Sequence, residues 1–170
     1  MGAVHTGLYV IMGVSGAGKT TIGSALARAL GVEFLEGDLL HPSSNVQRMA
    51  AGIALTDNDR RPWLIAIAQR LRDAKQSGIG LVVACSALKR SYRDLLRSRG
   101  AADVQFVYLA GDRPLIAERM AQRRDHFMPP GLLASQLASL QEPARDEEPW
   151  VYDIHQPPDT IVADLMKRIA

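Results

Sequence analysis

The stretch that decides the fold lies near the start of the chain and reads Leu8-Tyr9-Val10-Ile11-Met12, then Gly13-Val14-Ser15-Gly16-Ala17-Gly18-Lys19-Thr20. Its second part fits the pattern G-x-x-x-x-G-K-[ST]. An apolar run precedes this pattern and a helical periodicity follows it, which is the context that the pattern requires. The glycines let the backbone curl so that its N–H groups point at phosphate oxygens, and the helix N-terminus adds positive charge there. The stretch therefore predicts a phosphate-binding loop between a strand and a helix.

Two side chains of this loop are expected to contact the nucleotide and its metal ion. Lys19 is expected to reach the terminal phosphates of a nucleotide, and the Thr20 hydroxyl is expected to take one Mg²⁺ position. A dinucleotide-binding fold is the rival phosphate binder, but its glycine spacing is G-x-G-x-x-G and it has no use for the lysine. The residues expected to bind the nucleotide here are Gly13, Val14, Ser15, Gly16, Ala17, Gly18, Lys19, Thr20 and Thr21.

Length and composition narrow the class of protein. The 170 residues carry a net charge of +2 and are 47% hydrophobic, which suits a single domain over residues 1–170 and gives no field that would attract nucleic acid. The single cysteine, Cys85, excludes an intrachain disulfide framework and a thiolate zinc cluster, and is expected to be a small buried hydrophobe. No apolar run is long enough to cross a bilayer, and the start lacks the features of a secretory signal. We expect a cytoplasmic protein without a membrane partner.

Apolar runs alternate with helical periodicity along the chain. The runs expected as strands are Leu8–Met12, Glu33–Leu35, Ile79–Cys85, Val104–Leu109 and Val151–Ile154. Apolar stripes at helical spacing lie within Ile22–Leu30, Leu64–Leu71, Leu115–Met120 and Ile161–Ile169. Short continuous apolar runs suit strands that are buried on both faces of a parallel sheet. The alternation predicts a doubly wound α/β domain with right-handed crossovers.

Polar segments interrupt this pattern and are expected to be irregular functional loops. They are Gly37–Pro62, Gln122–Pro130 and Gln141–Pro149. In the first segment, Asp38 follows the second strand, where open α/β sheets place ligand groups, and its carboxylate could accept the proton of an attacking hydroxyl or lie near a metal. The alternative for this residue is a helix cap or turn. The other polar groups of the segment suit a small, polyhydroxylated anion, although each taken singly could be a solvated surface group; they are His41, Asn45, Arg48, Asp57, Asp59, Arg60 and Arg61.

These residues carry a resemblance to the small P-loop gluconokinases. Gly37-Asp38-Leu39-Leu40-His41-Pro42 with Asn45 resembles the family stretch G-D-x-x-H-P-x-x-N. The blocks that continue the resemblance in order are Met49-Ala50-Ala51-Gly52, Leu55, Asp57, Asp59-Arg60, Pro62-Trp63-Leu64, Cys85-Ser86-Ala87-Leu88-Lys89 with Tyr92-Arg93-Asp94-Leu95-Leu96-Arg97, His126-Phe127 and Leu140-Gln141-Glu142-Pro143. The segment Arg123-Arg124-Asp125-His126 departs slightly from the family pattern. The resemblance covers nearly the whole chain.

The resemblance implies ATP- and Mg²⁺-dependent phosphorylation of D-gluconate to 6-phospho-D-gluconate. It also implies a three-layer α/β/α fold of the P-loop NTPase type, with a five-stranded parallel sheet in the order 2-3-1-4-5 as in shikimate and nucleoside monophosphate kinases, and a homodimer. The acceptor would bind in residues 37–62, and residues 122–130 would form a lid. The alternatives are a kinase of the same fold that acts on another small acceptor such as shikimate, and a nucleotide-dependent switch. A GTP switch would want an N-K-x-D stretch, which the sequence lacks.

Phosphoryl transfer depends mostly on alignment and charge neutralisation. The expected catalytic residues are Lys19, Asp38 and Arg124, with Arg124 on the phosphates and Arg123 on the adenine base. The alternative for both arginines is a basic helix end that compensates its own dipole. The residues expected to bind the acceptor are Asp38, His41, Arg48, Asp57, Arg60, Lys89 and His126. Ser86, after the third strand, is expected either to reach Mg²⁺ through water or to cap a helix.

Overall fold

The computed structural model describes residues 2–122 and 132–170. Within them, five parallel strands form one sheet in the order β2-β3-β1-β4-β5. The strands are β1 (Leu8–Met12), β2 (Glu33–Glu36), β3 (Leu81–Ala84), β4 (Gln105–Ala110) and β5 (Trp150–Asp153). The predicted α/β/α architecture and its strand order 2-3-1-4-5 are confirmed.

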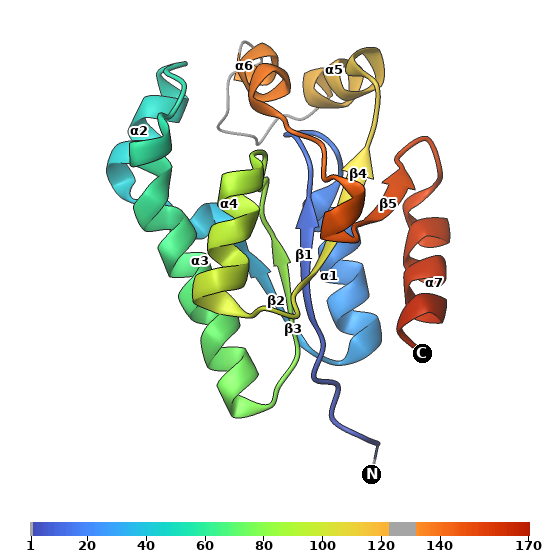
Figure 1. Cartoon of the computed structure of the whole chain (residues 1–170). Helices are drawn as coiled ribbons and strands as arrows, with labels where there is room; N and C mark the ends of the chain where they lie inside the picture. The colour runs from blue at the N-terminus through green and yellow to red at the C-terminus, as the bar shows by residue number, and fades with distance from the viewer. Residues whose placement is uncertain (1, 123–131) are drawn as a thin grey trace.

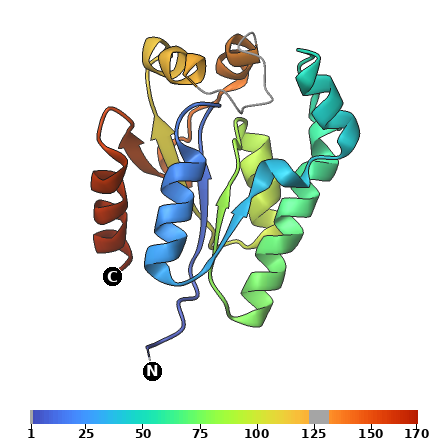
Figure 2. The ribbon, with the colours of Figure 1, turned by 180° about the vertical axis from the view of Figure 1, so that it is seen from behind.

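Helices cover both faces of the sheet because the central strands are apolar on both sides. One face packs on α3 (Asp57–Ser77) and α4 (Arg90–Leu95), which lie on one side of the sheet in Figure 1. The other face packs on α1 (Lys19–Leu30), α5 (Arg113–Ala121) and α7 (Pro158–Ile169), and Figure 2 shows α1 in front of the strands with α7 at the left. Neighbouring residues of one strand therefore enter different core clusters, as Val10 and Ile11 of β1 do.

The helices expected from apolar stripes are all present. Helices α4 and α6 (Leu132–Ser139) lie where no apolar stripe was expected. The third strand begins at Leu81 and not at Ile79, because Gly78 ends α3 in the left-handed conformation and the Ile79 N–H then donates to the Ala74 carbonyl. Glycine is favoured there because φ is 67°.

The expectation of an irregular loop over residues 37–62 is wrong. This segment holds a 3₁₀ turn (Gly37–Leu40), helix α2 (Ser43–Ala50) and the first turns of α3. Helix α3 begins there because Thr56 caps it: the Thr56 hydroxyl accepts from the Asp59 N–H at 3.1 Å, and the Asp59 carboxylate accepts from the Thr56 N–H at 2.9 Å. Pro62 lies inside α3 near its start.

Cys85 is completely buried at the end of β3, as expected. Burial raises the pKa of its thiol to about 12, so the group stays protonated and unreactive at neutral pH. Across residues 2–122 and 132–170, no helix combines the length and the apolar character needed to span a membrane.

Candidate active site

The phosphate loop leaves β1 at Met12 and enters α1 at Lys19. Gly16 and Gly18 have φ values of 87° and 99°, a region that side chains disfavour. A Cβ on Gly16 would also lie 2.8 Å from the Met120 Cγ, so a side chain there would require Met120 to shift. The Lys19 ammonium donates to the carbonyl oxygens of Gly13 and Val14 at 3.0 and 2.9 Å. These contacts hold the cation across the mouth of the loop.

A cleft of about 770 Å³, open to solvent, joins the phosphate loop to the segment after β2. The phosphate loop contributes Ser15, Gly16, Gly18, Lys19 and Thr20 to its lining. The segment from β2 to α3 contributes Glu36, Asp38, His41, Met49, Ala54, Leu55, Arg60 and Trp63. The remaining lining residues are Ser86, Leu88, Leu132, Ser135 and Gln136. The cleft lies at the carboxyl ends of the strands, where ligands of open α/β sheets bind.

Asp38 is carried on the 3₁₀ turn after β2, and the turn is fixed through Gly37. A Cβ on Gly37 would overlap the carbonyl oxygen of Ala84 in β3, so only glycine permits this close approach. The Gly37 carbonyl accepts a hydrogen bond from the Trp63 indole at 2.8 Å. The turn is therefore fixed to both β3 and α3, with Asp38 lining the cleft.

Oxygen atoms from several elements meet beside the phosphate loop. The Thr20 hydroxyl donates to the carboxylate of Glu36, the last residue of β2. Glu36, Asp38 and Ser86 line the same cleft. Hydroxyl and carboxylate oxygens are the ligands that Mg²⁺ prefers, so this donor set fits the expected metal. Sequence reasoning missed Glu36, although an acidic residue at the carboxyl end of a strand is a signal that could have found it.

His41 stacks on Trp63, with ring centroids 4.2 Å apart. Its burial lowers the pKa of the imidazole to about 4, so the ring is neutral at pH 7. The Asn45 amide lies 3.2 Å from Nδ1 and also donates to the Asp59 carbonyl at 2.8 Å. With Nδ1 accepting, the proton of the neutral ring is on Nε2, which makes His41 a neutral hydrogen-bond donor.

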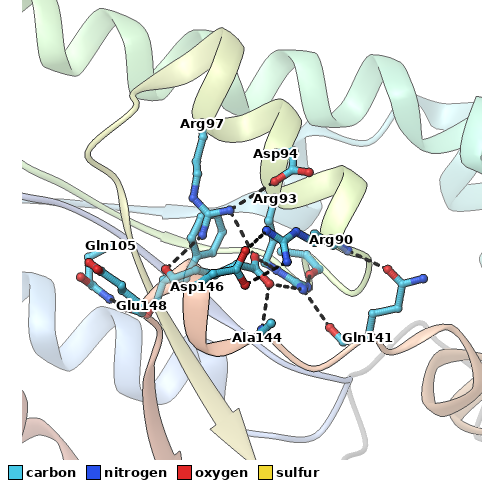
Figure 3. A network of polar contacts seen from close by, with 12 residues as sticks. Arg90, Arg93, Asp94, Arg97, Gln105, Gln141, Ala144, Asp146 and Glu148 are labelled. Carbon is cyan, nitrogen blue, oxygen red and sulfur yellow. Dashed lines mark hydrogen bonds and ion pairs between the residues drawn. The ribbon is translucent and has the colours of Figure 1, made fainter.

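The loop after β3 is held by a buried arginine. Arg93 of α4, labelled in Figure 3, donates to the carbonyls of Ala87 and Leu88 at 2.8 and 3.3 Å, and pairs with the Glu147 carboxylate at 2.8 Å. Ala87 has a φ of 45°, a strained value for a residue with a side chain. The Ser86 carbonyl accepts from the Gly13 N–H at 3.3 Å. Arg93 thus fixes a loop that contacts the phosphate loop and lines the cleft through Ser86.

Helix α6 lines the cleft through Leu132, Ser135 and Gln136. The Gln136 side-chain oxygen accepts from the Ser15 N–H at 2.6 Å. Leu132 packs with Met49 of α2 and Leu55 in one buried cluster. Sequence reasoning missed Gln136, because a lone glutamine 121 positions from its partner gives no local signal.

The structure brings together only part of the predicted acceptor set. Asp38, His41 and Arg60 line the cleft, whereas Arg48, Asp57 and Lys89 are not among its lining residues. Arg48 is half-exposed and faces Asp59 at 3.7 Å. Of the predicted nucleotide set, Val14 and Ala17 are buried beneath the loop and Thr21 is exposed on α1. Arg123, Arg124 and His126 lie outside the described residues.

Comparisons with known proteins agree with this geometry. Residues 8–143 match the family model described as AAA domain. A gluconokinase of Gluconobacter oxydans is 45% identical over 94% of this chain and 89% of its own length. The thermoresistant gluconokinase of Escherichia coli is 42% identical over 95% of this chain and 93% of its own length. The crystal structure of a gluconokinase from Sinorhizobium meliloti superposes with a TM-score of 0.86 and 46% identity, covering 98% of this chain and 93% of that one. The relatives match over nearly the full length of both chains, and this chain belongs to the gluconokinase family.

Proposed function

We propose that this chain transfers the terminal phosphoryl group of ATP to the 6-hydroxyl of D-gluconate and releases 6-phospho-D-gluconate and ADP. The observation that carries the proposal is the single cleft in which the phosphate loop faces Asp38, His41 and Arg60, in a chain of the gluconokinase family. Both halves of a kinase site, one for the nucleotide and one for the acceptor, open into this cleft.

The nucleotide half neutralises charge. The N–H groups of residues 13–20 and the start of α1 would surround the β- and γ-phosphates, and the Lys19 ammonium would exchange its carbonyl contacts for phosphate oxygens. Thr20, with the Glu36 carboxylate bonded to it, would hold Mg²⁺. The metal, when bound, supplies positive charge to the phosphates. Arg124 is proposed to add charge on the phosphates, and Arg123 to contact the base.

The acceptor half orients a hydroxyl. Asp38 would accept the proton of the 6-hydroxyl of gluconate. The hydroxyl oxygen would form a bond to the γ-phosphorus as the bond between that phosphorus and ADP breaks. The neutral His41 would donate a hydrogen bond to a sugar hydroxyl. Arg60 would pair with the gluconate carboxylate, for which a guanidinium fork is well suited. His126 is proposed to contact the acceptor from the lid.

The finer expectations of the sequence belong to the same proposal. We expect a cytoplasmic homodimer that uses ATP with Mg²⁺, and the mass of the particle in solution tests the oligomeric part. Gluconate would be the small-molecule partner of the enzyme.

An acceptor panel tests the proposal. Purified protein with MgATP is assayed for ADP release with gluconate, with shikimate and without acceptor. We expect ADP release to depend on gluconate and to be near background in the other two samples. Equal ADP release with and without gluconate would contradict acceptor phosphorylation, and a preference for shikimate would favour the other kinase of this fold.

A further inference from the structure

Arg60 is held in the cleft by a residue that does not line it. Its Nη1 donates to the Tyr92 hydroxyl at 3.0 Å, and the guanidinium carbon lies 5.7 Å from the centre of the tyrosine ring. Within the described chain, Tyr92 is the hydrogen-bond partner that the structure gives to the Arg60 side chain. Because Tyr92 belongs to α4 and Arg60 to α3, the contact also joins two helices.

The Tyr92 hydroxyl accepts from Arg60, so its own proton is donated elsewhere. It donates to Asp57 Oδ1 at 2.5 Å, and the same oxygen accepts from the Lys89 ammonium at 2.9 Å. The contacts therefore form one chain that runs from Lys89 through Asp57 and Tyr92 to Arg60. Hydrogen bonds in such a chain polarise one another, which strengthens the contact at the arginine.

The hydrogen-bonded residues between Lys89 and Arg60 differ in how deeply they are buried. Tyr92 is only 4% exposed, whereas the Asp57 side chain is 62% exposed and points to solvent outside the cleft lining. The hydrogen bonds from Tyr92 and Lys89 lower the pKa of Asp57, and burial raises the pKa of Tyr92. At neutral pH the carboxylate is ionised and the phenol keeps its proton, as the observed donor directions require.

We propose that Tyr92 and Asp57 are positioning residues that fix the Arg60 guanidinium. Its remaining N–H donors then face the carboxylate of the bound gluconate. Lys89 balances the charge of Asp57 and does not touch the substrate. This inference rests on the proposed function, because it assigns the residues that orient one end of gluconate. It also replaces the expectation from sequence that Asp57 and Lys89 bind the acceptor directly.

The test is Tyr92→Phe, which keeps the ring and removes only the hydroxyl. We expect the KM for gluconate to rise about tenfold, which corresponds to about 1.4 kcal/mol and lies in the range of a hydrogen bond to a charged group. The KM for MgATP and kcat should stay within about twofold. In the Arg60→Ala variant, adding Tyr92→Phe should raise the KM for gluconate by less than about twofold further, because the two residues act through one interaction.

Two further variants separate positioning from structure and from direct binding. Tyr152→Phe is the matched control, since this buried tyrosine donates to Asp164 at 2.6 Å and belongs to the other core cluster from Tyr92; its KM for gluconate should equal that of the wild type. Lys89→Met should raise the KM for gluconate less than Arg60→Ala does. Thermal unfolding of every variant checks that it is folded.

The possible outcomes distinguish a failure of the Tyr92 role from a failure of the proposed gluconate kinase activity. An active wild type whose KM for gluconate is unchanged by Tyr92→Phe would overturn the inference alone. Full additivity of Tyr92→Phe and Arg60→Ala, or a Lys89→Met effect as large as that of Arg60→Ala, would overturn it as well. A wild type that does not phosphorylate gluconate would refute the proposed function and the inference together.

Discussion

Lys19 and Asp38, two charged residues of the cleft lining, are both positioned by hydrogen bonds of the main chain around them. The Lys19 ammonium donates to two carbonyls of its own loop, and Asp38 is fixed through the neighbouring Gly37. The position of Asp38 is thus set before a ligand arrives, whereas the Lys19 ammonium would leave its two carbonyl contacts to bind a phosphate. Preorganised charge of this kind is a large source of catalysis, because little reorganisation is needed during the reaction.

Replacing the proposed base tests its role at the residue scale. Asp38→Asn keeps the size of the side chain and removes its basicity, so we expect kcat to fall by about 10²–10⁴-fold, the usual contribution of a general base. The KM for MgATP should change little. Steady-state assays with gluconate measure both constants. Asp73→Asn, on the exposed part of α3, is the control; turnover by Asp38→Asn near the wild-type level would show that the base is another group.

Local patterns explain which site residues the sequence could predict. Lys19 and Thr20 belong to a pattern of eight adjacent residues, and Asp38 follows a strand end, so all three lie in the cleft as the pattern indicates. Gln136 was missed, and Tyr92 belonged to a family block without a role, because their partners are distant in sequence, at 121 and 35 positions. Their contacts exist only after folding.

At the scale of elements, the polar helix α2 could not be predicted from periodicity. Only Asn45 and Met49 are buried in it, because the helix lies between the cleft and solvent and not on the core. The start of α3 did carry a signal, since Thr56 and Asp59 have the spacing of a capping box. A helix that lines a binding site lacks the apolar stripe by which core helices are recognised.

The ion pair of Arg93 and Glu147 links α4 to the 3₁₀ turn Arg145–Glu147. Their side chains are 0% and 2% exposed. Burial opposes ionisation of the Glu147 carboxyl, but hydrogen bonds from Arg93, from the Ala144 N–H and from Arg97 outweigh it and lower the pKa to about 2. A carboxylate whose pKa is lower in the folded state stabilises the fold above its unfolded pKa, and this contribution is lost as pH falls.

We therefore expect Glu147→Gln to lower the free energy of unfolding by about 3 kcal/mol at pH 7, because Arg93 is left buried without its anion. The difference from the wild type should shrink as pH falls from about 5 towards 2. Denaturant unfolding at several pH values measures it. Glu148→Gln, at the exposed neighbouring position, is the control. A difference that stays constant over this pH range would contradict the assigned pKa.

At the scale of the whole molecule, the strand order puts the site together. Because β1 lies between β3 and β4, with β2 beyond β3, the ends of β1, β2 and β3 meet at one edge of the sheet. This arrangement could be predicted, since buried parallel strands read as apolar runs and the family resemblance implies their order. Helix α6 lines the cleft at this edge through Leu132 and Gln136.

Binding of nucleotide should stabilise the whole fold. At a free concentration one hundred times its dissociation constant, MgATP should add about 2.7 kcal/mol and raise Tm by roughly 5–10 °C. Thermal unfolding with and without MgATP measures this shift. Lys19→Met should retain the Tm of the free wild type but show a smaller shift. An equal shift in both proteins would mean that the nucleotide does not use the phosphate loop.

The most direct test of phosphoryl transfer in this cleft is a ³¹P NMR spectrum of the reaction of the purified protein with MgATP and gluconate. We predict a new phosphate monoester resonance, split into a triplet by the two protons on carbon 6, that grows in equal amount with ADP. Inorganic phosphate in place of that ester, or an ester on another carbon, would contradict the account.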